Sequence, residues 1–338
     1  MTNTSSDNGL KPNSPKIVFL DQNAWIYLAQ GHYGVNRAFS EVAKLAVNAS
    51  EDERVIFPLY IGHFAETAKN KKMERRERLS QFMVKLSKGN TLLPSNIAIE
   101  REIECACLQA ITGETIDLLP WLLGKGYAHM MGSSGVQVEW DGVVPKEIEK
   151  INKMLSDKML DPKTFVALVN CGIDKQQLKE LTDNADKTVT LVEDIRKRNA
   201  GIPKASRYKT EVVMYFDNSL LKRIVDFMLS KQLSPKLLDP VFSNKDSLIR
   251  FFRTMPSNYC LFELSYFRDM QPQRKIQSND MNDLMSLCLA IPYCDVVVTE
   301  RQWANGANQR GIDKEYKTLV LGSVTDLKSA LSGIVGYH

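Results

Sequence analysis

The segment DMNDLMSLCLAIPYCDVVVTERQW, which begins at Asp280, constrains the fold of this chain more than any other stretch. Asp280 and Asp283 are three residues apart, so they share one face of the helix that the following apolar run predicts. Pro292 is expected to end that helix, because proline cannot continue it. Residues 296–299 then predict a short strand buried on both sides, as in a parallel sheet, and this strand stops at the acid Glu300.

The beginning of the chain repeats this order of strand, acid and helix. Residues 16–20 predict a buried strand that ends at Asp21, and a helix follows with Asn23 as its expected cap. Residues 55–58 predict a second strand. This strand leads into a long helical segment from about residue 60 to 86, which carries Glu66 in its first two turns. Each acid thus follows a predicted strand or lies early in the next helix.

The middle of the chain has a different character. From about residue 113 to 256 the strand signals nearly vanish, and helical segments separated by proline and glycine take their place. Strands that alternate with helices at both ends predict an α/β fold with a parallel sheet. We therefore predict a domain built from residues 16–112 and 257–338, interrupted by an all-helical insertion at 113–256, with residues 1–15 as a polar, disordered tail.

The composition excludes several classes of protein. The chain of 338 residues is 43% hydrophobic and 25% charged, which is ordinary for a soluble globular protein. It has no apolar run of the roughly 20 residues that a membrane span needs, and no apolar segment typical of a secretion signal. The six cysteines show no paired framework, which favours reduced thiols and a cytoplasmic location. The net charge of +4 permits a polyanionic partner without requiring one.

The predicted acids are expected to meet at one edge of the sheet, because in a doubly wound sheet the strand ends and the helices after them lie together. Carboxylates so placed would repel one another strongly unless a cation held them. Oxygen ligands with few histidines or thiols favour Mg²⁺ or Mn²⁺ over zinc. Such a site lowers the pKa of a bound water and stabilises an in-line phosphoryl displacement, so the pattern indicates phosphodiester hydrolysis. The expected ligands are Asp21, Glu66, Asp280, Asp283 and Glu300.

Three stretches, taken together and in order, resemble the PIN-domain nucleases: FLDQNAWI, HFAET and NDMNDLMSLCLAIPYCDVVVTERQW. More specifically, they resemble the PIN-like branch whose terminal motif reads PYCD before a strand and an acid. The resemblance implies a three-layer α/β/α sandwich and an acidic quartet that uses Mg²⁺ or Mn²⁺ to cut RNA, less often DNA. Carried over by position, the catalytic quartet is Asp21, Glu66, Asp283 and Glu300. Where Glu300 stands, the family commonly has an aspartate.

Substrate contacts are expected beside the acids and on the helix that carries Glu66. The basic middle of that helix is usually a solvated face in proteins, but it could also contact phosphates. We favour single-stranded or looped RNA, with single-stranded DNA as the other candidate, because unpaired bases are the more accessible. The insertion would add phosphate contacts, gate the site, or dock a regulatory protein or a second copy of the chain. The expected substrate-binding residues are Asn23, Lys69, Lys72, Arg76 and Thr299.

Each acid also has a simpler structural explanation. Asp21 would cap the following helix, Asp280 and Asp283 would favour a helix dipole, and Glu66 would be solvated. Glu300 would be a first-turn acid of the next helix. That all of these hold at once is less plausible than a shared site, given where each acid falls relative to its strand.

Two other functions compete with the nuclease. A non-catalytic PIN-like scaffold would act through its helical insertion, and it would leave Glu66 or Glu300 pointing away from the other acids. A phosphatase on a similar sheet is disfavoured, because Gln22 and Asn23 follow Asp21 where a second aspartate is expected two residues on. A nuclease that must be restrained is typical of a toxin or phage-defence effector, and that role extends the leading hypothesis.

Overall fold

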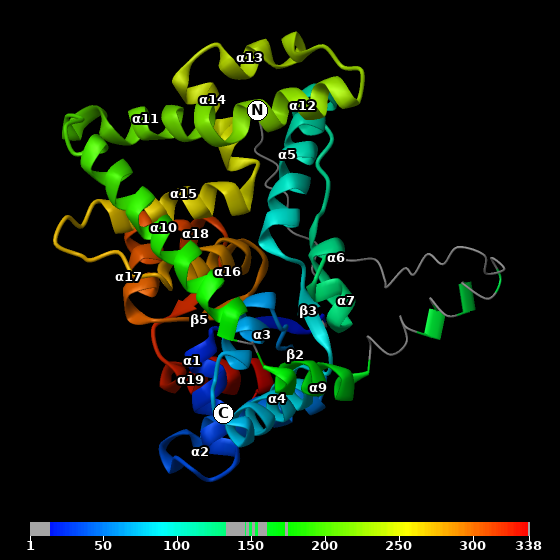
Figure 1. Ribbon diagram of the computed structural model, residues 1–338. Helices are drawn as coiled ribbons and strands as arrows, with labels where there is room; N and C mark the ends of the chain where they lie inside the picture. Colours follow the sequence, from blue (N-terminus) through cyan, green and yellow to red (C-terminus); the bar gives the residue numbers. More distant parts are fainter. Residues whose placement is uncertain are drawn as a thin grey trace.

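The computed structural model describes residues 14–132, 161–172 and 175–336, with a few isolated positions between 146 and 154. The predicted tail at 1–15 lies outside the described residues except for its last two. Helices make up most of the described chain, and a small sheet lies in the lower half of the view in Figure 1. Within the described ranges, no helix is both long and apolar enough to cross a membrane.

The main sheet has four parallel strands in the order β2-β1-β5-β6. Val18 of β1 pairs with Val296 of β5, so strands from the two ends of the chain lie side by side in the middle of the sheet. The strands follow from short runs of apolar, largely β-branched residues. The prediction of a parallel sheet assembled from both ends of the chain is therefore confirmed. The bounds are β1 (Lys16–Leu20), β2 (Val55–Ile56), β5 (Val296–Val298) and β6 (Leu319–Leu321).

Helices cover both faces of the sheet, because alternate strand residues point to opposite sides. Val18 and Leu20 belong to one apolar cluster, whereas Ile17 and Phe19 belong to another. The first cluster includes residues of α1 (Gln22–His32), α2 (Ser40–Glu51), α4 (Met73–Ser87) and α19 (Val324–Val335). The second includes residues of α5 (Ser95–Thr112), α15 (Pro256–Asp269), α16 (Asp280–Tyr293) and α17 (Arg301–Arg310).

The prediction of a single long helix between residues 60 and 86 is wrong, because the structure has two helices there. These are α3 (Ile61–Ala68) and α4. Asn70 lies between them, and its side-chain oxygen accepts a hydrogen bond of 3.1 Å from the backbone N–H of Lys72. An asparagine that bonds to the backbone two residues on favours a turn over a continued helix.

Pro292 does not end its helix at the preceding residue, as the sequence led us to expect. It lies inside the last turn of α16, which continues to Tyr293. The N–H of Cys294 donates to the carbonyl of Ala290 at 2.9 Å, so the last turn closes despite the missing proline donor. Other short elements are η1 (Arg37–Phe39) and α18 (Ile312–Glu315).

The insertion is not all helical. Its strand β4 (Leu123–Lys125) pairs antiparallel with β3 (Asn90–Leu92) in a separate, two-stranded sheet. The helices described here are α6 (Leu119–Leu122), α7 (Gly126–Met130), α9 (Pro162–Cys171), α10 (Lys175–Asn199), α11 (Lys204–Tyr215), η2 (Phe216–Leu220), α12 (Leu221–Ser230), η3 (Pro235–Leu238), α13 (Asp239–Phe242) and α14 (Lys245–Arg253).

The insertion packs directly on the part of the chain that bears the sheet. The ring of Phe252 in α14 lies 5.7 Å from that of Phe262 in α15, within the same apolar cluster as α16. Figure 1 shows α10 running down across α16, from the level of α11 toward the sheet. Arg196 near the end of α10 donates to the backbone carbonyl of Arg274 at 2.7 Å. This contact holds the chain just before α16 against the insertion.

Candidate active site

Four of the predicted acids lie around one small pocket. Asp21 follows β1 directly, Glu300 comes two residues after β5, and Asp283 lies in the first turn of α16. Glu66 reaches the pocket from α3. The pocket has a volume of about 70 Å³. Its other lining residues are Gln22, Asn23, Tyr60, Gly62, His63, Asn279, Asn282 and Ser286.

The electrostatics of the pocket disfavour ionised carboxylates. Burial raises the pKa of Asp21 to about 7, and the nearby Asp283, Glu300 and Glu66 add to the rise. Burial likewise raises the pKa of Asp283 to about 7, again with Glu300 and Glu66 as negative neighbours. The pKa of Glu66 is raised by burial and by Glu300, and lowered by Lys69. The acids are thus gathered with Lys69 as a nearby cation beside Glu66, while the described lining residues themselves include neither lysine nor arginine.

The two aspartates of the pocket are held by contacts of their own. Asp21, rather than the expected Asn23, is the N-cap of α1: its Oδ1 accepts from the N–H of Ala24 at 2.8 Å. Asp283 Oδ2 accepts from the indole N–H of Trp303 at 3.0 Å. These contacts engage one oxygen of each aspartate and fix the carboxyl group. The capping explanation for Asp21 therefore holds, together with its place in the pocket.

Glu300 and Asn23 form a pair at the mouth of the pocket. The side-chain amide of Asn23 donates to Glu300 Oε1 at 3.1 Å, and that of Gln302 donates to Oε2 at 3.0 Å. Glu300 precedes α17 without capping it through its side chain. Thr299, expected to bind substrate, is buried and does not line the pocket, and its backbone N–H bonds to the carbonyl of Leu321 in the sheet.

Asp280, predicted as a fifth metal ligand, is not one of the acids around this pocket. It is 2% exposed, and both of its oxygens accept from the guanidinium of Arg274, at 2.7 and 2.9 Å. The backbone N–H of Gln277 donates to the same carboxylate at 3.1 Å. An aspartate occupied in this way has its charge matched by arginine, so the ligand role predicted for Asp280 does not fit the structure.

The predicted basic contacts separate into two groups. Lys69 lies near Glu66, whose pKa its charge lowers, and Lys72 is exposed just before α4. Arg76, in contrast, donates to the backbone carbonyls of Asn70 and Asn170, at 2.7 and 2.9 Å. Arg76 thus ties α4 to α9, and its predicted role in binding substrate does not fit these contacts.

His63 lies beneath the pocket as a structural histidine. It is 4% exposed, and burial lowers its pKa to about 3, so the ring is neutral. Its Nδ1 accepts from the backbone N–H of Tyr60 at 3.1 Å and so caps the start of α3. These contacts give His63 a structural role at the start of α3.

The sequence analysis missed several polar residues of the pocket. Asn279 and Ser286 lie four residues before and three after Asp283, and Asn282 directly precedes it. Positions three and four apart share a helix face, so the spacing from Asp283 was the signal that could have found the first two. Trp303 lies 20 residues after Asp283, and nothing local in the sequence pairs the two.

The pocket's donor set suits a hard cation, although the side chains stand apart. Across the described ranges, no three or more His, Cys, Asp and Glu side chains are grouped so that they could hold an ion as they stand. Comparison with protein-family models, with curated proteins and with solved structures found no match for this chain. A function must therefore be argued from the chain's own residues and their geometry.

Proposed function

We propose that this chain is a divalent-metal-dependent nuclease that hydrolyses phosphodiester bonds on a PIN-like three-layer fold. RNA is the favoured substrate, and single-stranded DNA is the other candidate. The observation that carries the proposal is that Asp21, Glu66, Asp283 and Glu300, from four separate parts of the chain, line one small pocket. The pKa of Asp21 and of Asp283, raised to about 7 chiefly by burial, supports it. Several buried carboxylates gathered at the strand ends and helix starts of one sheet edge are typical of a site built for a cation.

The residues present fit Mg²⁺ or Mn²⁺ better than a softer metal. Carboxylate and amide oxygens are the donors that these ions prefer, and the described lining residues include no cysteine. When bound, such an ion supplies activation of a water molecule and charge neutralisation at a phosphate. Glu66 and Glu300 both line the pocket, which supports the nuclease over the non-catalytic scaffold.

The chain's own residues would divide the remaining work. Asp21 and Asp283 would hold the ion with the oxygen that their fixed contacts leave free, since Ala24 and Trp303 engage the other. Glu300, steadied by Asn23, would complete the negative surface from the side of β5. Lys69 would bind a substrate phosphate near Glu66. Pre-fixed ligands avoid the cost of reorganisation during the reaction.

Metal removal tests the proposal directly. Purified protein is incubated with a pool of RNA and of single-stranded DNA, with Mn²⁺ or with EDTA, beside an Asp21→Asn variant. We expect cleavage with Mn²⁺ or Mg²⁺, none with EDTA, and none by the variant, because an amide keeps the shape of the side chain but loses its ligand charge. Cleavage that persists in EDTA, or that the variant performs at the wild-type rate, would count against the site.

A further inference from the structure

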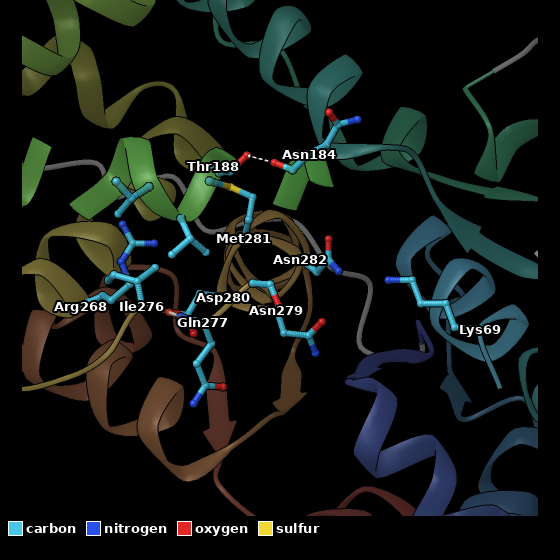
Figure 2. A pocket seen from close by; sticks show the side chains of 13 residues that line it. Lys69, Asn184, Thr188, Arg268, Ile276, Gln277, Asn279, Asp280, Met281 and Asn282 are labelled. Atoms are coloured by element: carbon cyan, nitrogen blue, oxygen red, sulfur yellow. Dashed lines mark hydrogen bonds between the residues drawn. The ribbon is translucent and has the colours of Figure 1, made fainter. Parts of the chain in front are cut away.

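A second and larger cavity lies beside the acidic pocket, between α10 of the insertion and the start of α16 (Figure 2). Its volume is about 310 Å³. Asn279 and Asn282 line both this cavity and the acidic pocket, so the two adjoin at these residues. Helix α10 contributes Asn184, Thr188, Val189 and Val192, and the segment before α16 contributes Ile276, Gln277 and Ser278.

The lining combines free amides with apolar side chains. Within the described chain, no hydrogen bond engages the side-chain amide of Gln277, Asn279 or Asn282. Each of these amides offers donors and an acceptor together. Val189 and Ile276 add apolar surface beside them. The cavity is therefore suited to a flat ligand with apolar faces and a polar edge.

The charge of this cavity differs from that of the acidic pocket. Asp280 is the one acid among its described lining residues, and Arg274 neutralises it at 2.7 Å. Lys69 lines the same cavity and lies on the side of the N-terminal helices in Figure 2. Lys69 also lowers the pKa of Glu66, so its positive charge acts on the acidic pocket as well as on this cavity. A phosphate at this position would be attracted rather than repelled.

The cavity wall is pre-organised by the insertion. The guanidinium of Arg196 on α10 donates to the backbone carbonyls of Arg268 and Arg274, at 3.0 and 2.7 Å. These contacts fix the segment that leads into Ile276 and Gln277 before any ligand arrives. A pre-ordered wall reduces the conformational entropy lost on binding.

We propose that this cavity binds an unpaired base of a single-stranded nucleic acid, next to the phosphate at the acidic pocket, a role that rests on the nuclease function proposed above. A nucleobase has apolar faces and an edge of donors and acceptors, which matches Val189 and the amides of Gln277 and Asn279. Bases within a duplex have their edges already paired, so they cannot use these amides. The insertion thereby selects single-stranded substrate.

The test fills the cavity from its α10 side. Thr188→Trp places an indole in it, and Leu191→Trp is the matched control, because Leu191 is 58% exposed on the same helix and does not line the cavity. Binding of a fluorescent single-stranded hexaribonucleotide, and of an abasic oligonucleotide of the same length, is measured by anisotropy in the Asp283→Asn background. We expect Thr188→Trp to weaken hexaribonucleotide binding by about tenfold or more, and Leu191→Trp to leave it unchanged. Neither variant should alter binding of the abasic probe.

The outcomes separate the base site from the nuclease. Equal affinity for both probes, an unchanged affinity in Thr188→Trp, or no binding at all overturns the base site. If Thr188→Trp disturbs folding, the test uses Gln277→Ala instead, because Gln277 is at an exposed loop position. Unchanged hexaribonucleotide binding by Gln277→Ala would likewise overturn the base site. Cleavage of the hexaribonucleotide by wild-type protein with Mn²⁺ is scored separately. Base-dependent binding without cleavage retains the base site and rejects the nuclease.

Discussion

Replacing Asp283 by asparagine is expected to abolish cleavage and, without metal at about pH 8, to raise the free energy of unfolding by roughly 2–4 kcal/mol. Cleavage is lost because asparagine cannot supply ligand charge, and we expect a loss greater than the ten- to hundredfold typical of an outer partner of a metal site. Stability rises because the variant removes a buried charge that Glu300 and Glu66 repel. The amide oxygen can still accept from Trp303.

The stability gain should depend on pH in a defined direction. The pKa of Asp283 is raised to about 7 in the folded chain, above its ordinary value of about 4 in the unfolded chain. Between those values the folded state binds more protons than the unfolded state, so this group makes wild-type stability fall as pH rises from about 4 to about 7. The advantage of the variant is therefore full above about pH 7 and absent below about pH 4.

Thermal and urea unfolding of both proteins in EDTA measure this difference. Asp295→Asn is the matched control, because Asp295 is also an aspartate of this α16–β5 segment but pairs with Lys16 at 2.7 Å. It should lose a little stability and keep cleavage. Added Mn²⁺ should stabilise the wild type more than Asp283→Asn, since binding to the folded state adds to its stability. A variant no more stable than the wild type in EDTA at about pH 8 would refute the cost of burying the charge of Asp283 beside Glu300 and Glu66.

The meeting of the acids could be predicted from the sequence because its causes are local. Asp21 and Glu300 each follow a short apolar run, and parallel pairing brings the ends of β1 and β5 together. Asp283 is placed by the helix that precedes β5. Neighbouring strands and the residues directly after them thus form a unit that a linear pattern can reveal.

The partners of the basic residues could not be predicted, because they lie far apart in the chain. From the sequence, Arg76 resembles a solvated helix residue. In the fold, its guanidinium donates to the backbone carbonyl of Asn170 at 2.9 Å. The strand β4 was missed for another reason: Leu123, Gly124 and Lys125 include no β-branched or aromatic residue. Its pairing with β3 outweighs that weak local preference.

Asp280 shows how one acidic pattern can hold two different roles. It shares a helix turn with Asp283, and the spacing of the two acids alone gives no reason to expect different partners for them. In the fold, Asp280 turns to Arg274, whose guanidinium also lies 5.1 Å from the centre of the Trp303 ring. Trp303 in turn donates to Asp283. The Asp280–Arg274 ion pair thus supports Trp303, and Trp303 positions the carboxylate of Asp283.

Arg274→Ala is therefore expected to destabilise the protein by about 3–5 kcal/mol, the cost typical of stranding one partner of a buried ion pair. Asp280 is 2% exposed and would keep only the N–H of Gln277 for its carboxylate. The expected loss is measured by urea unfolding at neutral pH. Cleavage should also weaken, because Trp303 loses the guanidinium packed on its ring.

Two further variants isolate the stranded charge as the cause. Arg253→Ala removes an exposed guanidinium that lies 5.5 Å from the Tyr259 ring and pairs with no buried acid among the residues the structure describes, so it should cost only about 1 kcal/mol or less. The double variant Arg274→Ala, Asp280→Asn leaves no charge to strand and should recover most of the lost stability. If the double variant is no more stable than Arg274→Ala alone, the ion pair is not what Arg274 contributes, and its packing against Trp303 must account for the loss.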